Sequence, residues 1–350
     1  MAPNQSIDRI IQEELARGHF TDAYIACGYL FEDTPQYEQS WLSSEAKIFD
    51  LASLTKALVT GPLMFQWALD RKRQLTDTLS VFGSYQELPQ VLSDRTLAQL
   101  LGHYSGLPAW WNFWITCLQE QSPTMNREER LARISEVLPR IPVGPVGPDL
   151  YSDIGYILLG YLLERECGKD LGALFSSWKQ SLAKTAVIDQ IGYASDLQLA
   201  PSHFVPTAYC ALRKRRLQGE VHDENCAGLG GKAGHAGLFA TGEALTRYLR
   251  ELYASPQGKA YLEANYLALQ ESEHEGLLGL RRGKVASAQV FAAGKAMGHL
   301  GFTGTAFWID WDKKFYGIFL SNRVISGRIS SRMGEVRTQV FRQLYESCKI

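Results

Sequence analysis

The chain has 350 residues, of which 45% are hydrophobic, so it can bury one large core or two smaller ones. Its 36 Lys and Arg residues nearly cancel its 37 Asp and Glu residues, which leaves a formal net charge of −1. This balance gives no electrostatic reason to expect binding to nucleic acid or to an anionic membrane surface. The composition predicts a globular protein without a polymer partner and leaves the oligomeric state open.

The amino-terminal segment, residues 1–20, is typical of an amphipathic helix and shows no export signal. The longest apolar stretch, residues 154–163, is about half of the ~20 residues that a membrane-spanning helix needs, which predicts a buried helix and no membrane span. We therefore expect a cytoplasmic protein, or a periplasmic one if a leader has been removed. The six cysteines include no C-x-x-C pair, which favours reduced thiols, although their even number leaves disulfides open.

The predicted elements change in kind along the chain. A strand is expected over residues 23–31, and a short apolar piece at 48–53 leads into a helix that opens at Ser53. Helical spacing of apolar residues then dominates the middle of the chain, at 129–138, 156–168 and 244–254. Strands return after Gly294, at 304–311 and 314–322, and a helix over 331–348 closes the chain.

This order predicts an α/β domain built from both chain ends, with a helical insertion between them. We expect residues 1–72 and 285–350 to form the α/β domain and residues 73–284 to form a mainly helical domain, an α/β plus all-α architecture. A functional site is expected where the two parts meet.

Ser53 and Lys56 are a candidate nucleophile and its activating base. A serine hydroxyl reacts only when a neighbouring base takes its proton, and lysine can be that base if burial or charge lowers its pKa. Residues three apart in a helix share a face, and a serine at a helix start lies near free backbone N–H groups. An ordinary N-cap role for Ser53 remains the alternative.

The spacing S-x-x-K is not specific by itself, because the chain contains it more than once. It occurs at Ser44/Lys47, Ser53/Lys56, Ser176/Lys179 and Ser181/Lys184. Only the second pair stands at a predicted junction of strand and long apolar helix, and we expect the others to lie on solvated faces.

Four ordered segments resemble the motifs of penicillin-recognising serine hydrolases. They are FDLASLTKAL around Ser53, LLGHYSGLPAW around His103, LYSDIGYILLGYLLE around Tyr151 and GHLGFTGTAFWID around His299. The resemblance spans nearly the whole chain and is greatest to the class C branch of penicillin-binding proteins, β-lactamases, carboxypeptidases and esterases. It implies a β-lactamase/D,D-peptidase-like fold, in which helices flank an antiparallel sheet and a helical lobe is inserted.

The resemblance also implies a role for each matched residue. Ser53 would be acylated, Lys56 would accept or relay its proton, and Tyr151 would pass a proton to the leaving group. The segment from His299 to Gly301 matches the K-T-G or H-T-G strand, whose first residue faces the carboxylate of the substrate. The backbone N–H groups of Ser53 and Phe302 would form the oxyanion hole. A buried core position is the alternative for Tyr151.

Two residues depart from the family pattern. The Y-x-N motif ends in Asp153, and an ionised carboxylate can only accept hydrogen bonds where the family's amide donates one. We expect Asp153 to pair with Lys56, to hold it charged and to shift the duty of base towards Tyr151. Leu300 replaces the threonine of the strand motif and removes a hydroxyl that usually helps to hold a carboxylate.

Other polar and aromatic residues have less specific readings. We expect His103 to make a structural hydrogen bond and not to act as a base. Metal binding and loop ordering are both open for His222, Asp223, Glu224 and His235, but their spacing fits no compact zinc pattern, and no metal or other cofactor is predicted. The neighbouring tryptophans are expected to pack a loop or to wall a pocket: Trp110, Trp111 and Trp114.

These expectations converge on a serine hydrolase that forms an acyl-enzyme at Ser53 with a small-molecule or short-peptide amide or ester. A D,D-carboxypeptidase, a β-lactamase and an esterase share this machinery, and the fold does not decide among them. The alternative is a non-catalytic binding or regulatory protein on the same scaffold, because Asp153 and Leu300 both depart from the pattern.

Overall fold

The computed structural model describes residues 3–43, 45–84, 88–114, 125–182, 189–291, 295–328 and 332–348. The helices are α1 (Pro3–Ala16), α2 (Gly61–Asp70), α3 (Leu97–Leu101), α4 (Arg127–Val137), α5 (Asp153–Cys167), α6 (Leu171–Leu182), α7 (Ala194–Leu197), α8 (Glu224–Gly228), α9 (Gly242–Ala254), α10 (Pro256–Glu271), α11 (Ala286–Gln289) and α12 (Met333–Ser347). Shorter helical turns are η1 (Lys56–Thr60), η2 (Leu79–Val81), η4 (Gln90–Leu92), η6 (Leu138–Arg140), η7 (Pro201–His203) and η8 (Arg323–Ser326). The strands are β1 (Ala23–Tyr29), β2 (Tyr37–Trp41), β3 (Phe49–Asp50), β4 (Ile191–Tyr193), β5 (Tyr209–Cys210), β6 (Arg215–Arg216), β7 (Leu238–Ala240), β8 (Arg281–Arg282), β9 (Ala296–Gly301), β10 (Thr305–Asp310) and β11 (Phe315–Ser321).

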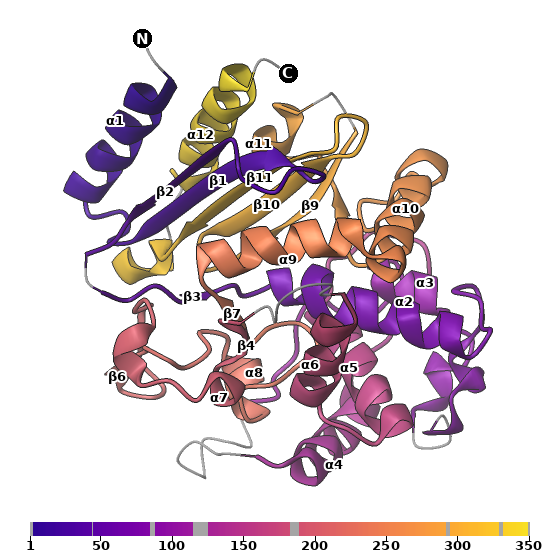
Figure 1. Cartoon of the computed structure of the whole chain (residues 1–350). Helices are drawn as coiled ribbons and strands as arrows, with labels where there is room; N and C mark the ends of the chain where they lie inside the picture. Colours follow the sequence, from indigo (N-terminus) through magenta and orange to yellow (C-terminus); the bar gives the residue numbers. More distant parts are fainter. Residues whose placement is uncertain are drawn as a thin grey trace.

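The main sheet joins the two ends of the chain. Within the described residues its strands follow the order β2-β1-β11-β10-β9-β8, and all neighbours are antiparallel (Figure 1). Strand β1, near the start of the chain, pairs with β11, near its end, so that Ala23 lies opposite Ser321. The predicted fold class, an antiparallel sheet flanked by helices, is confirmed.

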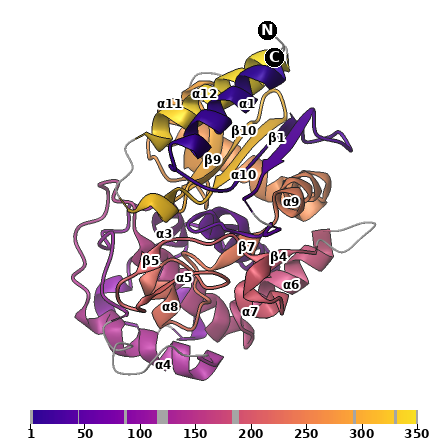
Figure 2. The same ribbon diagram turned by 90° about the vertical axis from the view of Figure 1, so that its left-hand side faces the viewer.

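The two faces of this sheet pack against different helices, because successive side chains of a strand point in opposite directions. Ile25 and Cys27 of β1 belong to a core that also holds apolar side chains of α1 and α12. Tyr24 and Ala26 belong to the larger core, which extends into α2, α5 and α9. Helices α1, α11 and α12 cover one face of the sheet, and α9 lies along the other (Figures 1 and 2).

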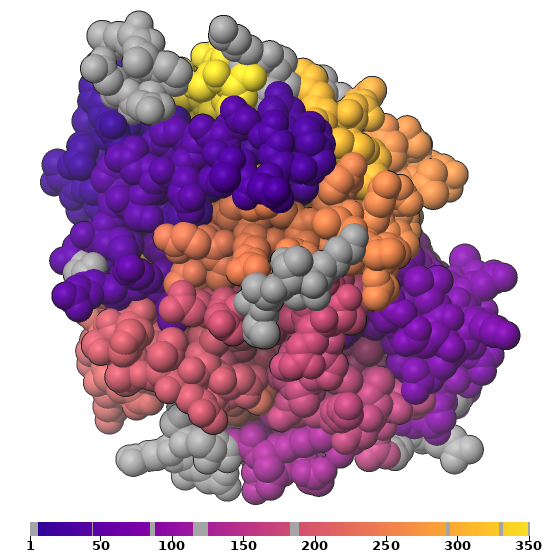
Figure 3. Space-filling view, viewed as in Figure 1, coloured from indigo at the N-terminus to yellow at the C-terminus, as the bar shows by residue number. Residues whose placement is uncertain are grey.

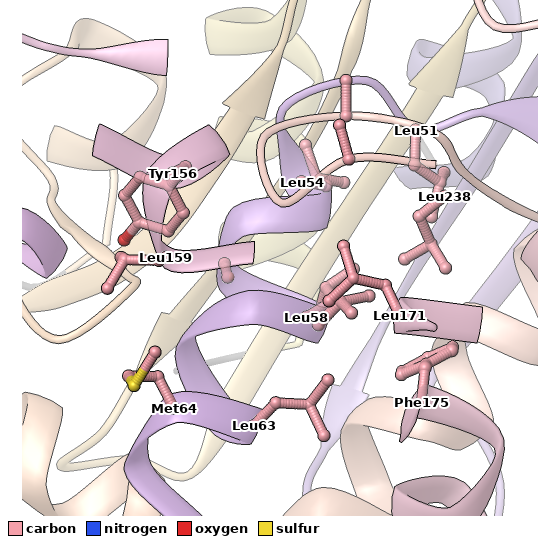
Figure 4. Close-up of a cluster of buried hydrophobic side chains, with 14 of the residues drawn as sticks. Leu51, Leu54, Leu58, Leu63, Met64, Tyr156, Leu159, Leu171, Phe175 and Leu238 are labelled. Carbon is pink, nitrogen blue, oxygen red and sulfur yellow. The ribbon is translucent and has the colours of Figure 1, made fainter. Parts of the chain in front are cut away.

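The helical part lies below the sheet and is built around the apolar helix α5. The Ser152 hydroxyl caps the start of α5 by accepting from the N–H of Gly155 at 3.1 Å, and the helix ends at Gly168 with a left-handed φ of 66°. Side chains of α5, α6 and the segment after Ser53 meet in one buried cluster (Figure 4). The predicted buried helix is therefore present. In the space-filling view, an orange band of surface lies between the indigo surface of the start of the chain and the pink and magenta surface of the helical part (Figure 3).

The structure differs from the predicted elements near the candidate nucleophile. The sequence predicts a strand over residues 48–53, whereas only β3 is extended, and it pairs with β7 in a small separate sheet of order β3-β7-β4. The chain then turns sharply at Ala52. The predicted helix begins after this turn with the π-helical turn η1 before α2. Strand β2 escapes prediction because it is a short, polar edge strand.

The boundaries expected for the two domains, at residues 72/73 and 284/285, remain a prediction. Among the described helices, none combines the length and the apolar composition that a membrane span requires. The cysteines in the described part of the chain are free thiols, and Cys117 lies outside it.

Candidate active site

Ser53 lies at a tight turn between β3 and the helix that continues into α2. Ala52, immediately before it, has a φ of 48°, in the left-handed region that residues with a Cβ rarely adopt. Two hydrogen bonds hold the turn: the N–H of Ala52 donates to Asp50 Oδ1 at 2.8 Å, and Thr55 Oγ1 donates to the carbonyl of Ala52 at 2.7 Å. The turn places the half-buried Ser53 at the wall of a pocket of about 740 Å³.

Lys56 follows one turn later, and its exposed fraction is 0%. Its Nζ lies 3.2 Å from Ser53 Oγ, 3.1 Å from the carbonyl oxygen of His235 and 2.7 Å from Asp153 Oδ1. The π-helical geometry at Lys56 is rare and recurs at functional sites. The structure therefore brings together Ser53, Lys56 and Asp153, the three residues that the sequence predicts as neighbours.

Opposing effects act on the pKa of Lys56. Burial disfavours the ammonium, but the carboxylate of Asp153 and the hydroxyl of Tyr151 favour it, and together they raise the pKa above its ordinary value. Lys56 is therefore an ammonium at neutral pH in the resting protein. It has to lose a proton before it can act as a base.

Tyr151 approaches this pair from the segment that precedes α5. Lys56 Nζ lies 4.9 Å from the centre of its ring, and both Lys56 and Ser53 act on the pKa of its hydroxyl. Burial raises the pKa of Tyr151, although the ammonium of Lys56 opposes this effect. Tyr151 therefore keeps its proton at neutral pH and is placed to donate it.

The end of strand β9 forms another wall of the pocket, where Gly301 and Phe302 line the same cavity as Ser53. The hydroxyls of Thr303 and Thr305 donate to two backbone carbonyls of the segment just before Ser53, at 2.7 and 3.1 Å. A Cβ at Gly301 would collide with Thr305 Oγ1, so only glycine allows the strand to come this close. The two segments predicted to supply the oxyanion hole are thus fastened to each other.

His299 departs from the position that its motif implies. It is 1% exposed and does not line the pocket; its Nδ1 lies 2.8 Å from the carbonyl of Leu300. Burial, together with the positive charges of Lys56 and Arg281, holds the pKa of His299 well below its usual value. His299 is therefore a neutral, buried ring, so of the two forms that the motif allows, a cation or a hydrogen-bond donor, only the donor remains a prediction.

Two other residues singled out in the sequence help to shape the pocket. Trp110, which is 44% exposed, forms part of the pocket wall. His103 is buried, and its Nδ1 accepts from the N–H of Ser152 at 3.0 Å. This bond holds the segment that carries Tyr151, so His103 has the structural part predicted for it.

The loop from His222 to His235 closes over Lys56. Asp223 Oδ1 accepts from the N–H of Cys226 at 2.7 Å and lies 2.8 Å from His235 Nε2, while the carbonyl of His235 contacts Lys56. In the described part of the chain, no group of three or more His, Cys, Asp or Glu side chains is placed to hold a metal ion. These contacts hold the loop in place beside Lys56. They fit loop ordering, one of the two roles that the sequence left open for these residues.

The remaining S-x-x-K pairs give no comparable cluster where the structure describes them. Ser176 is exposed on α6, and Lys179 Nζ donates to the carbonyl of Ile191 at 2.6 Å. Ser44 and Lys184 lie outside the described residues, so the two pairs that contain them stay predictions.

Asp50 is a candidate functional residue to which the sequence motifs assign no role. Its carboxylate is 2% exposed and accepts from the N–H of Ala52 at 2.8 Å and from the N–H of His222 at 2.7 Å. Burial raises the pKa of Asp50 to about 6, although both N–H donors oppose the shift. Asp50 therefore ties the turn before Ser53 to the loop that closes over Lys56. The only hint in the sequence is a carboxylate inside the apolar run IFDLAS.

We expect the Asp50→Asn variant to lose a pH dependence of stability that the native protein shows. The pKa of Asp50 rises from 3.8 to about 6 on folding, so between these pH values the folded protein binds more protons than the unfolded one. The free energy of unfolding contributed by Asp50 should therefore fall as the pH rises through this window, by at most about 3 kcal/mol. Urea unfolding at pH 4 to 7 measures this slope, and the exposed Asp94, replaced by Asn, is the control. Equal slopes in the native protein and in Asp50→Asn would refute the raised pKa.

Comparisons with known proteins find similar sequences and similar folds. The model of the Beta-lactamase family matches residues 7–338. The N-acetylmuramyl-L-alanine amidase of Bacillus subtilis is 29% identical over 87% of this chain and 78% of its own, and a putative D-alanyl-D-alanine carboxypeptidase of Escherichia coli is 24% identical over 82% and 71%. The solved structure of D-amino acid amidase from Ochrobactrum anthropi SV3 with D-phenylalanine superimposes over 99% of both chains with a TM-score of 0.71. Its sequence identity of 16% makes this a likeness of fold alone.

Proposed function

The chain belongs to the Beta-lactamase family, and on this basis we propose that it is a serine hydrolase that forms an acyl-enzyme at Ser53. The observation that carries the proposal is the position of Lys56 Nζ, which is fully buried and 3.2 Å from Ser53 Oγ. A serine becomes a nucleophile when a partner of this kind removes its proton.

Asp153 and Tyr151 complete the path of protons in this proposal. Lys56 first passes a proton to Asp153, whose Oδ1 is 2.7 Å away, and then accepts the proton of Ser53 as Oγ attacks the substrate carbonyl. Tyr151, which is still a phenol, donates its proton to the departing amine or alcohol and is reprotonated by Lys56. The backbone N–H groups of Ser53 and Phe302 hold the oxyanion. Water then cleaves the ester at Ser53 and releases the acid.

We favour a small amide as the substrate, such as a short peptide or an amino-acid amide. The pocket volume of about 740 Å³ is within the range of small-molecule sites. Two of the similar proteins are named as amidases, and a third as a putative carboxypeptidase, so each name refers to cleavage of an amide bond. Esters and β-lactams are the alternative substrates of the same machinery.

Active-site labelling tests the proposal directly. We expect one covalent adduct after incubation with a fluorophosphonate and one after incubation with benzylpenicillin, both located on Ser53 by peptide mapping and mass spectrometry. An adduct on a different serine would show that this serine, and not Ser53, is the nucleophile. If neither reagent forms an adduct, the non-catalytic alternative is favoured. Asp153 and Leu300, which depart from the family pattern, are the residues that support that alternative.

A further inference from the structure

Two cysteines from distant parts of the chain are in contact on the face of the main sheet that α12 covers. Cys27 belongs to β1, and Cys348 directly follows the last residue of α12 (Figures 1 and 2). Their Sγ atoms are 3.4 Å apart, although 321 residues separate them in the sequence. Both are free thiols, and neither lines the pocket of Ser53. The proposed hydrolysis therefore gives this pair no role.

Both cysteines lie on firmly held backbone. Cys27 is fully buried and pairs with Gly317 of β11 on one side and with Tyr37 of β2 on the other. The N–H of Cys348 donates to the carbonyl of Leu344 at 3.2 Å, and Leu344 packs in the same core as Cys27. The sulfur atoms of a disulfide are about 2.0 Å apart, so the two Sγ atoms have to approach each other by roughly 1.4 Å. Rotation of the Cys348 side chain at the helix end can supply this movement.

The two thiols differ in access and in acidity. Cys348 is half-buried, whereas Cys27 is shielded by the sheet and by the core beside α12. A hydrogen bond from Cys27 lowers the pKa of the Cys348 thiol, although burial opposes this effect. The hydrogen bond with Cys348, followed by burial, raises the pKa of Cys27. Because the thiolate is the form that attacks a disulfide, Cys348 is the thiol that reacts first and Cys27 is the one that resolves the product.

We propose that Cys27 and Cys348 form a redox-active pair that a low-molecular-weight disulfide, such as glutathione disulfide, converts into an internal disulfide. In the first step the Cys348 thiolate attacks one sulfur of glutathione disulfide, breaks its S–S bond and releases one glutathione thiolate. In the second step Cys27 loses its proton and attacks Sγ of Cys348, which forms the internal S–S bond and releases the second glutathione. The protein is oxidised by two electrons, and glutathione disulfide is reduced to two molecules of glutathione.

The cross-link fastens α12 to β1. Helix α12 also contributes Met333 and Gly334 to the wall of the pocket, so the link anchors an element that shapes the site of Ser53. Joining residues that are 321 positions apart restricts the unfolded chain much more than the folded one, in which the two sulfurs already touch. The oxidised protein is therefore the more stable form. This inference does not depend on the proposed hydrolase activity.

Oxidation of the native protein tests the pair directly. The reduced protein is incubated with glutathione disulfide without denaturant, quenched with N-ethylmaleimide and mapped by mass spectrometry without reduction. We expect a peptide that joins Cys27 to Cys348 as the main product, with loss of two of the six thiols. The urea concentration at the midpoint of unfolding should rise by about 0.5 M or more, and dithiothreitol should reverse the change.

Three variants separate the steps. Cys348→Ser should form no cross-link and take no glutathione at the buried Cys27, and its unfolding midpoint should be the same with and without glutathione disulfide. Cys27→Ala should stop at the mixed disulfide on Cys348. Cys167→Ser is the matched control, because Cys167 is also half-buried but lies at the end of α5, and it should keep both the cross-link and the gain in stability.

Several results would overturn the proposal. They are a native protein that stays unmodified, a mixed disulfide on Cys348 that persists in the native protein, and a cross-link to a different cysteine. An unchanged or lower unfolding midpoint in the cross-linked protein would do the same, because it would show that the folded chain does not accommodate the bond.

Discussion

Replacing Ser53 with alanine is expected to lower amide or ester hydrolysis by about a thousandfold or more and to abolish labelling by a fluorophosphonate. The substitution removes the attacking oxygen but leaves the other contacts of Lys56, with Asp153 at 2.7 Å and the carbonyl of His235 at 3.1 Å. The fold should therefore survive, with the free energy of unfolding changed by about 1 kcal/mol or less. Turnover, labelling and urea unfolding of the same preparation measure the three effects.

Ser176→Ala is the matched control for this experiment, because Ser176 has the same spacing to Lys179 but lies exposed on α6. Its removal should leave hydrolysis and labelling unchanged. Full activity of the Ser53→Ala variant, or loss of activity on replacing Ser176, would disprove the assignment of the nucleophile.

The local part of this site is predictable from sequence because it depends on helix geometry alone. A separation of three residues puts Ser53 and Lys56 on one face. Tyr151 and Asp153 lie far away in the sequence, and only the resemblance to the family's motifs assigned them to the same site. The left-handed turn at Ala52 and the π-helical turn at Lys56 are not predictable in this way. The turn at Ala52 is held by the N–H of Ala52, which donates to Asp50, and it follows a strand that pairs with β7. Asp50 in turn accepts from the N–H of His222, and these long-range contacts have no local pattern.

The long-range part of the site needs the folded chain. The carbonyl that contacts Lys56 belongs to His235, 179 residues away, and a backbone atom has no signature in the sequence. Asp50 and the N–H of His222 are 172 residues apart. Arg323 of η8 and Arg337 of α12 line the same pocket as Gly301 of β9, which no local pattern indicates. His299 is a further case, because the burial that lowers its pKa comes from tertiary packing, which the strand motif does not encode.

The pair of Lys56 and Asp153 sets the protonation state on which the proposed mechanism depends. Lys56 is fully buried, so its ammonium is stable only because the Asp153 carboxylate and its other partners offset the cost of burial. A buried lysine without a counter-charge loses its proton, with a pKa that can fall several units below the ordinary value. Asp153 therefore keeps Lys56 inactive as a base until a substrate disturbs the pair.

We expect Asp153→Asn to speed acylation of Ser53 by β-lactams by about tenfold or more at pH 7, while the native reaction changes less. Each unit by which the pKa of Lys56 falls towards the assay pH gives about ten times more neutral lysine. No acceptor for the lysine proton is then needed, because Lys56 is already neutral at rest. The asparagine also provides the amide donor that the family's motif places there. The acylation rate against pH, measured by mass spectrometry, should rise at lower pH than in the native protein.

Asp153→Ala separates the two effects of that substitution, because it removes the charge without adding an amide. If the loss of charge causes the faster acylation, the pH profile of the alanine variant should also shift to lower pH. Only the asparagine variant should bind the β-lactam carbonyl more tightly. Loss of both β-lactam acylation and native hydrolysis in the two variants would show that the carboxylate is required throughout the cycle. Asp153 would then be the obligatory proton acceptor or charge partner of Lys56. The replacement of the family's asparagine by Asp153 would in that case affect the catalytic mechanism and not the choice of substrate.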